Sequence, residues 1–226
     1  MKPPINLFGG FDSRESAGYF TFCSSVIRRA TKPVSITPLA SMGLPFGSNA
    51  FTLSRFLVPA LCGFKGHALF LDASDMLCQA DIAELDALFD ERYAVQVVKH
   101  DDYDSLHKRK YIGTDMECVQ TNYSRKNWAS VMLINCAHPV WKGFNPQLLS
   151  SRPALHFLQF QNLLDSEIGD LPAEWNVLVD EGQDMAGAKV LHWSNGIPSF
   201  KHYQNSRRSL DWFKEFDHVT EGKQDG

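Results

Sequence analysis

The chain has 226 residues, of which 44% are hydrophobic, 12% aromatic and 21% charged, with a formal net charge of -4. This aromatic content with so small a net charge excludes intrinsic disorder, and a pI of about 6.0 argues against nucleic-acid binding, which depends on Lys and Arg neutralising phosphates. We expect a single domain over residues 1–220, followed by a flexible tail over residues 221–226.

The cysteines and the N-terminal sequence both indicate in which cellular compartment the protein is expected. Five cysteines are scattered without a CxxC pair, which favours reduced thiols over a disulfide framework or a zinc ribbon. The N-terminal sequence MKPPINLFGG lacks the apolar region of a signal peptide. No apolar run approaches the about 20 residues of a membrane span. We therefore expect a soluble, cytoplasmic protein without a transmembrane segment.

Strand-like and helix-like segments alternate through the first part of the chain. Ile5–Phe8 is apolar and is followed by two glycines, as a buried strand would be. Asp12 and Glu15 then stand at capping-box spacing, and the next residues keep one face small or apolar, which predicts a helix over Ser13–Ala30. The elements predicted next are a strand over Pro33–Thr37, a helix over Phe51–Leu61 and a strand over His67–Leu71.

The alternation continues in the second part. Asp81 and Glu84 repeat the capping-box spacing and predict another helix, and Asp101–Asn127 is a long polar segment, which we expect to be a functional loop. Strands that are apolar throughout and alternate with helices indicate a mostly parallel sheet covered on both faces. The remaining predicted elements are strands over Tyr93–Lys99, Ala129–Asn135 and Lys189–Trp193 and a helix over Arg207–Phe216.

The most informative stretch is LFLDASDMLCQADIAEL, residues Leu69–Leu85. Its buried strand would deliver Asp72 and Asp75 to the carboxyl end, where open α/β sheets bind their ligands. Two carboxylates without a Lys or Arg in the same turn repel each other. A divalent cation removes the repulsion and provides a positive centre for a diphosphate. The alternative is that both residues only form the turn and cap the next element, and this stretch alone leaves the two interpretations open.

Several other phrases accompany the acidic stretch in a fixed order. They are FGGFDSRE near the start, SNAFTLSRFLVPALCGFKG (Ser48–Gly66), NWASVMLIN (Asn127–Asn135), LPAEWNVLV (Leu171–Val179) and KVLHWSNGIPSF (Lys189–Phe200). Together with FLDASDML, these phrases resemble motifs of nucleotide-sugar glycosyltransferases with the GT-A fold. The resemblance is greatest to the retaining family 8, which includes glycogenin and bacterial galactosyl- and glucosyltransferases.

The resemblance extends from about Phe8 to Phe200. It implies an α/β fold of the GT-A type, Rossmann-like, with a central, mostly parallel sheet flanked by helices. Two departures stand out. The acidic motif is D-x-x-D instead of D-x-D, and the Lys of the family's K-P-W phrase is absent, because Pro198 is followed by Ser199. A phosphate contact is therefore missing, or is supplied by Lys201.

The resemblance implies a metal site. It places the family's metal-binding histidine at His192, and Asp75 is the firmer carboxylate ligand. Asp72 either joins them on the ion or hydrogen-bonds the ribose of the donor. The expected ion is Mn²⁺ or Mg²⁺, which take oxygen ligands and, for Mn²⁺, imidazole as well. For His192 the alternative is an ordinary core or surface histidine.

The resemblance also implies residues that hold the nucleotide-sugar donor. Arg55 would contact it through its guanidinium group, with a solvated helix face as the alternative. Gly196 would bring backbone N–H groups to the phosphates. The turn after the first strand would bind the base, with a simple strand-to-helix turn as the alternative; its candidate residues are Phe8, Gly9, Gly10, Phe11, Asp12 and Arg14.

Asp165, with Gln161 as the second candidate, is expected to face the sugar and the reacting centre, because the family has an acidic or amide segment before the L-P-x-x-W-N phrase. The alternative for Asp165 is an ordinary loop carboxylate. The basic stretches His107–Lys110 and Arg207–Arg208 are interpreted as solvated faces, with binding of an anionic acceptor as the other possibility.

The sequence thus predicts a metal-dependent, retaining glycosyltransferase. It would move a sugar from a nucleoside-diphosphate sugar to a hydroxyl of a glycan or another acceptor. The resemblance implies that the donor is a UDP-sugar. Retention is implied by the resemblance only. No covalent nucleophile can be named from the sequence, and attack on the same face as the leaving group is taken as the default for the resembling family. Two alternatives stay open: a catalytically silent module that binds a sugar nucleotide or a glycan, and a sugar nucleotidyltransferase.

Overall fold

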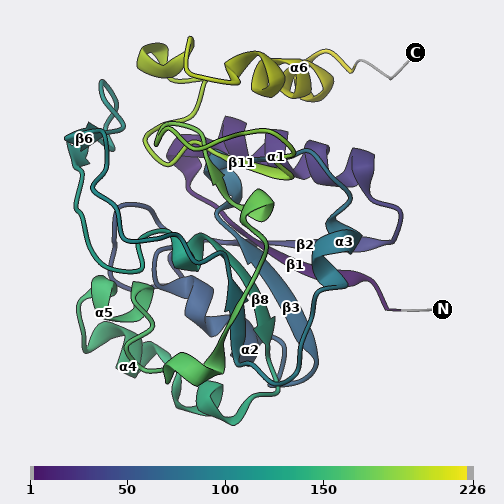
Figure 1. Ribbon diagram of the computed structural model, residues 1–226, viewed down its shortest axis with the longest axis vertical. Coiled ribbons are helices and arrows are strands. Elements are labelled where there is room, and N and C mark those ends of the chain that lie inside the picture. The colour runs from purple at the N-terminus through teal and green to yellow at the C-terminus, as the bar shows by residue number, and fades with distance from the viewer. Residues whose placement is uncertain (1–2, 223–226) are drawn as a thin grey trace.

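A six-stranded mixed sheet forms the centre of the computed structural model, which describes residues 3–222 (Figure 1). Five strands run in one direction and β8 alone runs against them, since it pairs antiparallel with both of its neighbours. In spatial order the strands are β2 (Val34–Leu39), β1 (Ile5–Gly10), β3 (His67–Leu71), β8 (Val131–Asn135), β5 (Val95–Val97) and β9 (Ile168–Asp170).

The reversed direction of β8 shapes the edge of the sheet where β3 ends. Leu71, the last residue of β3, lies opposite Val131, the first residue of β8. The backbone N–H of Asp72 then donates to the carbonyl oxygen of Ser130 at 2.9 Å. The acidic turn after β3 and the segment before β8 therefore meet at one end of the sheet.

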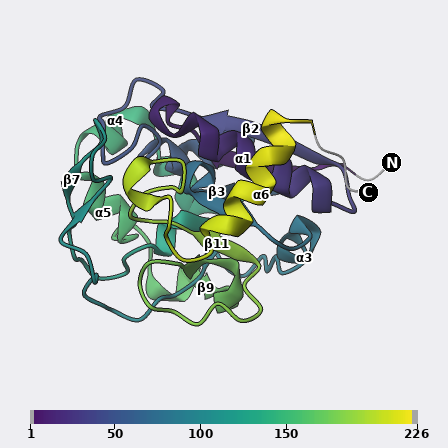
Figure 2. The same ribbon diagram turned by 90° about the horizontal axis from the view of Figure 1, so that it is seen from above.

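One face of the sheet is covered by α1 (Ser16–Arg29), which is preceded by a 3-10 turn over Ser13–Glu15. The C-terminal helix α6 (Ser209–Thr220) lies across α1 on the outside of the molecule (Figures 1 and 2). Glu215 of α6 joins the two helices, because its carboxylate accepts from Arg28 and Arg29, each at 2.9 Å. The short helix α3 (Ile82–Asp86) is capped by Asp81.

The opposite face packs against an aromatic core. Phe56, Phe144, Phe157 and Phe160 contact one another there, with ring centroids 6.0–6.3 Å apart. Burying such side chains supplies much of the hydrophobic stabilisation, about 1.5–3 kcal/mol each. The helices on this face are α2 (Val58–Leu61), α4 (Pro146–Ser150) and α5 (Ala154–Leu158).

A second, three-stranded sheet extends from the acidic turn. Its strands are β10 (Val177–Leu178), β11 (Val190–His192) and β4 (Met76–Cys78), in that order. The long polar segment over 101–127 contains a two-stranded hairpin of β6 (Arg109–Lys110) and β7 (Cys118–Val119).

The predicted strand over His67–Leu71 has the predicted ends, and the other predicted elements are present with shifted ends. The predicted helix over Phe51–Leu61 is a 3-10 turn from Ser54 that continues into the single turn of α2. The C-terminal helix begins at Ser209, because Arg208 adopts a left-handed conformation with φ 59°. It ends at Thr220, and residues 223–226 of the predicted tail lie outside the described residues.

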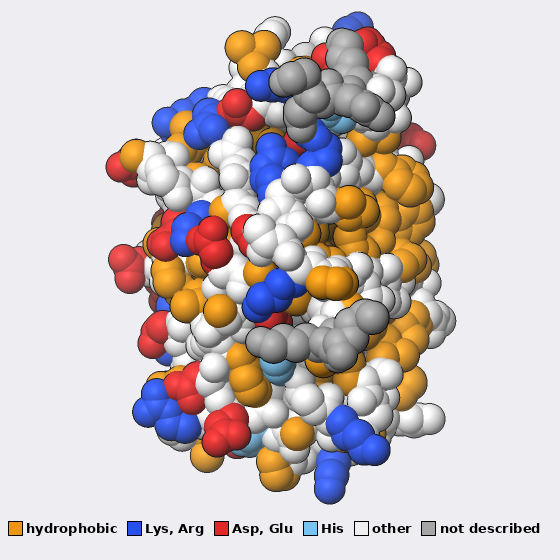
Figure 3. Space-filling view, turned by 90° about the vertical axis from the view of Figure 1, so that its right-hand side faces the viewer, with side chains coloured by type: hydrophobic (Ala, Val, Ile, Leu, Met, Phe, Trp, Pro, Cys, Tyr) orange, Lys and Arg blue, Asp and Glu red, His pale blue; other side chains and the backbone are white. Residues whose placement is uncertain are grey.

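The thiols, the helix lengths and the surface charges can each be compared with the predictions. All five cysteines are free thiols. Over residues 3–222, no helix combines the length and the apolar character needed to cross a membrane. On the face shown in Figure 3, Lys and Arg side chains are intermixed with Asp and Glu, as expected for a net charge of -4.

Candidate active site

The acidic turn places two carboxylates at the end of the buried strand β3. Residues Ala73–Asp75 form a 3-10 turn, in which the N–H of Asp75 donates to the carbonyl oxygen of Asp72 at 3.1 Å. This turn supplies the bend that the i, i+3 spacing requires, since strand residues on one face would be i, i+2. Asp72 is 6% exposed and Asp75 is 3% exposed, so both carboxylates are removed from bulk water.

His192 reaches the same point from the second sheet. It is the last residue of β11 and pairs with Met76, the residue after the acidic turn. Its Nε2 lies 3.4 Å from Oδ1 of Asp75, and its ring is buried. One oxygen or nitrogen atom from each of Asp72, Asp75 and His192 lies within 4.8 Å of the others, so the three side chains predicted as metal ligands form one cluster.

Asn176 fixes the orientation of the histidine ring. Its Nδ2 donates to the carbonyl oxygen of Asn127 at 3.1 Å, which leaves Oδ1 to accept from Nδ1 of His192 at 2.9 Å. Nδ1 therefore carries a proton, and in the neutral ring Nε2 has its lone pair directed at the carboxylates. Such an outer hydrogen bond is the usual support of a metal-binding histidine.

The cluster fits a divalent cation. Oδ1 of Asp72 and Oδ1 of Asp75 are buried without a hydrogen-bond partner, and leaving such atoms unpaired is costly. Burial is the main cause that raises the pKa of Asp72 to about 6, while Arg55 lowers it and Asp75 raises it further. Burial, the largest single effect, lowers the pKa of His192, but Asp75, Asp72 and Asp180 together outweigh it, so the pKa is raised. Asp72, Asp75 and His192 could together hold a metal ion.

Arg55 is buried, so the solvated helix face considered for it is wrong. Its Nη1 donates to the carbonyl oxygen of Ala129 at 2.6 Å, and its Nε donates to that of Thr52 at 3.1 Å. Nη1 also lies 2.8 Å from Oδ1 of Asp72, without the geometry of a hydrogen bond. The guanidinium group is packed over the ring of Phe70, 4.8 Å from its centroid. Arg55 is thus a fixed positive charge next to Asp72.

Glu15 is a buried carboxyl group behind the turn that the sequence did not identify as part of the site. It is 0% exposed, its Oε2 accepts from Oγ of Ser74 at 3.2 Å, and its Oε1 has no partner. Burial, followed by the charge of Asp75, raises its pKa well above the usual value. Its one sequence signal was capping-box spacing with Asp12, which indicates a helix start and not a site.

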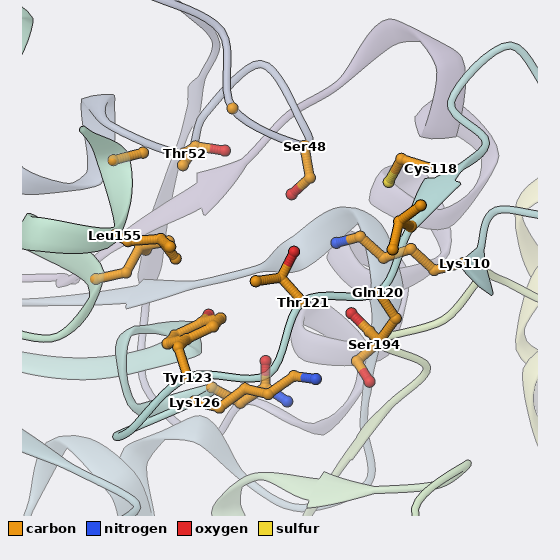
Figure 4. Close-up of a pocket in the computed structure, with 15 residues that line it drawn as sticks. Ser48, Thr52, Lys110, Cys118, Gln120, Thr121, Tyr123, Lys126, Leu155 and Ser194 are labelled. Atoms are coloured by element: carbon orange, nitrogen blue, oxygen red, sulfur yellow. The ribbon is translucent and has the colours of Figure 1, made fainter. Parts of the chain in front are cut away.

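The cluster opens into two adjoining cavities. A small cavity of about 60 Å³ is lined by Asp72, Asp75, His192 and Arg55, and a larger one of about 390 Å³ lies beside it (Figure 4). The larger volume falls in the range of ligand-binding pockets. Both cavities are lined by Ser48, Thr52, Lys110, Tyr123, Asn127, Leu158 and Ser194.

The turn after β1 lines neither of these cavities. Asp12 caps the 3-10 turn by accepting from the N–H of Arg14 at 3.0 Å, and the Arg14 side chain pairs with it at 2.6 Å. Phe11 packs edge-on against Tyr19, with ring centroids 5.1 Å apart. Phe8 and Gly9 lie in the buried strand. These contacts are those of a strand-to-helix turn capped by Asp12, and binding of the base by this turn stays a prediction.

Asp165, Gln161 and Gly196 also lie outside the linings of both cavities. The Asp165 side chain is 85% exposed and pairs with Arg125 at 2.6 Å. Gln161 is exposed and donates to Gln159 at 2.6 Å. Gly196 has φ 151°, and its N–H donates to the carbonyl oxygen of Trp193 at 3.1 Å, so that N–H group is already used within the protein.

The structure instead brings in residues from two loops. Ser48 and Thr52 come from the segment after β2, and Lys110, Tyr123 and Lys126 come from the long polar segment, all of them in the cavity wall. The predicted functional loop over 101–127 is therefore part of the site. Lys201, considered as a replacement phosphate contact, is exposed and lines neither cavity.

Comparison with solved structures places the fold among glycosyltransferases. The chain matches the bifunctional glycosyltransferase WbbM with a TM-score of 0.61 and 15% identity, over 95% of this chain and 53% of that one. It matches GlyE of Streptococcus pneumoniae with a TM-score of 0.60 and 14% identity, over 95% and 60% of the two chains. The galactosyltransferase LgtC, solved with donor and acceptor sugar analogs, gives a TM-score of 0.58 and 12% identity, over 94% and 95%.

These likenesses confirm the predicted α/β fold of the GT-A type, with a central sheet flanked by helices. The chain spans only about half of the WbbM chain and 60% of the GlyE chain. No model of a known protein family matches the sequence. The Arabidopsis thaliana protein named Protein CDI is 35% identical over 232 residues, which cover 96% of this chain and 87% of that protein. The chain therefore belongs to the family of Protein CDI.

Proposed function

We propose that the protein is a metal-dependent glycosyltransferase, which moves a sugar from a nucleoside-diphosphate sugar to an acceptor hydroxyl. The observation that carries this proposal is the buried cluster of Asp72, Asp75 and His192 at the carboxyl end of β3, beside a cavity of about 390 Å³. Open α/β sheets bind ligands at this edge, and the fold is that of glycosyltransferases.

In this proposal Asp72, Asp75 and His192 hold Mn²⁺ or Mg²⁺, which when bound neutralises the charge that develops on the leaving diphosphate. Asn176 keeps Nε2 of His192 free of a proton, because its Oδ1 accepts a hydrogen bond from the N–H group at Nδ1. Arg55 adds a second fixed positive charge 2.8 Å from Asp72. Charges that are already in place need no reorganisation when the bond breaks, and this is the largest contribution in many enzymes.

The larger cavity is proposed to hold the sugar and the acceptor. The cavity linings contain no carboxylate besides Asp72 and Asp75 among residues 3–222. A covalent intermediate needs a free carboxylate next to the anomeric carbon, and both of these are assigned to the metal. This supports retention through attack by the acceptor hydroxyl on the face that the leaving group departs from. A UDP-sugar remains the proposed donor, and a glycan or another hydroxyl compound the proposed acceptor.

The test is release of nucleoside diphosphate from a panel of nucleotide sugars, with Mn²⁺, with Mg²⁺ and with a chelator. We expect slow hydrolysis of one donor that requires metal and that is lost in Asp75→Ala and His192→Ala. The surface variant Lys201→Ala, which lies outside both cavities, serves as the control and should match the parent. Full activity of the Asp75 and His192 variants would refute the metal site.

A catalytically silent binding module is the second candidate, favoured by the altered D-x-x-D spacing of Asp72 and Asp75. It predicts that a nucleotide sugar raises the melting temperature with metal present, while no diphosphate is released even with acceptors. A nucleotidyltransferase is disfavoured, because FGGFDSRE has two glycines and one arginine and lacks the glycine-rich, Lys/Arg-bearing signature that such an enzyme would show after the first strand.

A further inference from the structure

Two lysines line the larger cavity without a carboxylate partner. Lys126 is 5% exposed, and its Nζ donates to Oδ1 of Asn122 at 3.3 Å and lies 5.4 Å from the centroid of Tyr103. Lys110 is half-buried, and its Nζ lies 4.9 Å from the centroid of the Tyr111 ring. Within the described part of the chain, neither ammonium group has a carboxylate at ion-pair distance.

This arrangement is costly without a ligand. A buried charge is normally paired, since its lost hydration must be replaced. Burial is the main cause that lowers the pKa of Lys126; Glu181 opposes it, the positive charge of Lys110 adds to it, and Asp104 opposes it less. An anion bound in the cavity would provide a charge partner for both ammonium groups.

The surrounding groups suit a phosphate. Figure 4 shows Lys110 extending into the cavity toward the side where Ser48 and Thr121 lie, with Lys126 on the wall below. Hydroxyl donors together with ammonium groups provide the several hydrogen bonds that phosphate oxygens accept, and lysine is a common phosphate ligand. Lys110 also lines the small cavity that contains Asp72 and Asp75, so it connects the lysine pair to the proposed metal site.

We propose that Lys110 and Lys126 form a phosphate-binding subsite in the larger cavity, so that one of the substrates is held by a phosphate group there. The inference rests on the proposed function, because only that function makes the ligand a substrate. It adds that this substrate carries a phosphate group. The phosphate belongs either to the diphosphate of the donor or to a phosphorylated acceptor. If it is the donor's, the phosphate contact that the resemblance placed near Pro198 is supplied from the long polar segment instead.

The experiment compares Lys110→Met and Lys126→Met with the parent by calorimetric titration. Methionine keeps the length of the side chain and removes its charge. Lys126→Arg restores the charge, and Lys108→Met is the matched control, because Lys108 is an exposed lysine of the same segment outside the cavity. The ligands are inorganic pyrophosphate without metal, UDP with Mn²⁺, and glucose 6-phosphate as a sugar phosphate.

We expect the parent to bind pyrophosphate, and each methionine variant to bind it about 10- to 100-fold more weakly, the range for one charge-assisted hydrogen bond. Lys108→Met should bind as the parent does, and Lys126→Arg should recover most of the affinity. Equal melting temperatures would show that the variants are folded. No binding by the parent, or equal binding by parent and methionine variants, would overturn the subsite.

The other two ligands identify the source of the phosphate. A parallel loss of affinity for UDP with Mn²⁺ assigns the subsite to the donor, while a loss restricted to glucose 6-phosphate assigns it to a phosphorylated acceptor. The pyrophosphate measurement uses neither metal nor turnover, so it is independent of the proposed function. If lysine-dependent pyrophosphate binding is found but no nucleotide sugar is turned over, the proposed function fails and the subsite stands.

Discussion

Asn176 offers the sharpest test of how the histidine is held. In Asn176→Ala, Nδ1 of His192 loses its acceptor and the carbonyl oxygen of Asn127 loses its donor. The ring is then free to rotate or to carry its proton on Nε2, which abolishes the lone pair aimed at Asp75. Removing an outer hydrogen bond of this type weakens metal binding about 10- to 100-fold, or about 1.4–2.7 kcal/mol.

The assay is the rise in melting temperature with increasing Mn²⁺. A ligand at 100 times its Kd stabilises the folded state by about 2.7 kcal/mol, which raises the melting temperature of a chain of this size by roughly 5–10 °C. In Asn176→Ala the same rise should need about 10- to 100-fold more Mn²⁺. Asn176→Asp keeps an acceptor for Nδ1 and should keep much of the affinity.

Loss of packing alone is controlled by Asn135→Ala. Asn135 is likewise a buried bridging amide, whose Nδ2 donates to the carbonyl oxygen of Glu91 at 3.0 Å and whose Oδ1 accepts from the N–H of Ala137 at 3.2 Å. It lies at the far end of β8, opposite His67. Both alanine variants should lose about 2–4 kcal/mol of stability from two broken bonds. If Asn176→Ala nevertheless responds to Mn²⁺ as Asn135→Ala does, the assigned role of Asn176 is wrong.

Three further substitutions test the surroundings of the turn. Gly18→Ala should destabilise the protein by more than 2 kcal/mol, on the order of a buried steric clash, because the new Cβ would lie 1.9 Å from the carbonyl oxygen of Ser74; a thermal melt equal to the parent's would contradict the packing. Glu15→Gln should raise the melting temperature at neutral pH in metal-free buffer. The folded pKa of Glu15 is raised, so the carboxyl group contributes its full stability below pH 4.5 and loses this contribution as the pH rises. The melting temperature of Glu15→Gln should therefore exceed the parent's by an amount that grows above pH 4.5, and no such growth would refute the reasoning. Glu215→Gln should destabilise the protein at neutral pH. Burial is the largest single effect and raises the pKa of Glu215, but the bonds from Arg29, Ser24 and Arg28 together outweigh it and lower the folded pKa. The stability lost in Glu215→Gln should therefore shrink as the pH falls below 4.5, and urea titrations at several pH values measure this loss.

The fold and the acidic turn could be predicted because their signals are local. The run His67–Leu71 is apolar and ends in Asp72, which predicts a buried strand and its carboxyl end, and the structure has the strand with these same bounds. The capping-box spacing at Asp81 predicts a helix, and Asp81 indeed accepts from the N–H of Ala83 at 2.9 Å. His192 came from the resemblance, and the structure places it in the cluster with both aspartates.

The rest of the cavity depends on contacts between distant segments. Lys126 was not singled out, because nothing in the polar segment tells which side chains turn inward. The phrase that begins at Ser48 was part of the resemblance and drew attention to Arg55, but nothing in it indicated that Ser48 and Thr52 would line the cavity. Asp165 was expected at the centre, but its carboxylate is directed at Arg125 on the surface. An acidic residue in a loop has no periodicity that could indicate its direction.

Buried carboxylates in this protein are of two kinds: those with a structural partner for every oxygen, and those at the candidate site that leave an oxygen without a hydrogen bond. The carboxylate of Glu215 is 3% exposed, like that of Asp75, but it accepts from two arginines and a serine, so its charge is fully paired within the protein. Asp75 and Asp72 each leave Oδ1 without a hydrogen bond. Arg55 lies 2.8 Å from Oδ1 of Asp72 and His192 lies 3.4 Å from Oδ1 of Asp75, so each carboxylate has a neighbour but an incomplete set of hydrogen bonds. Burying carboxylates in this state costs several kcal/mol. Because these incompletely hydrogen-bonded oxygens lie at the edge where the two cavities meet, they, and not the fully paired carboxylate of Glu215, indicate the place that could hold a cation.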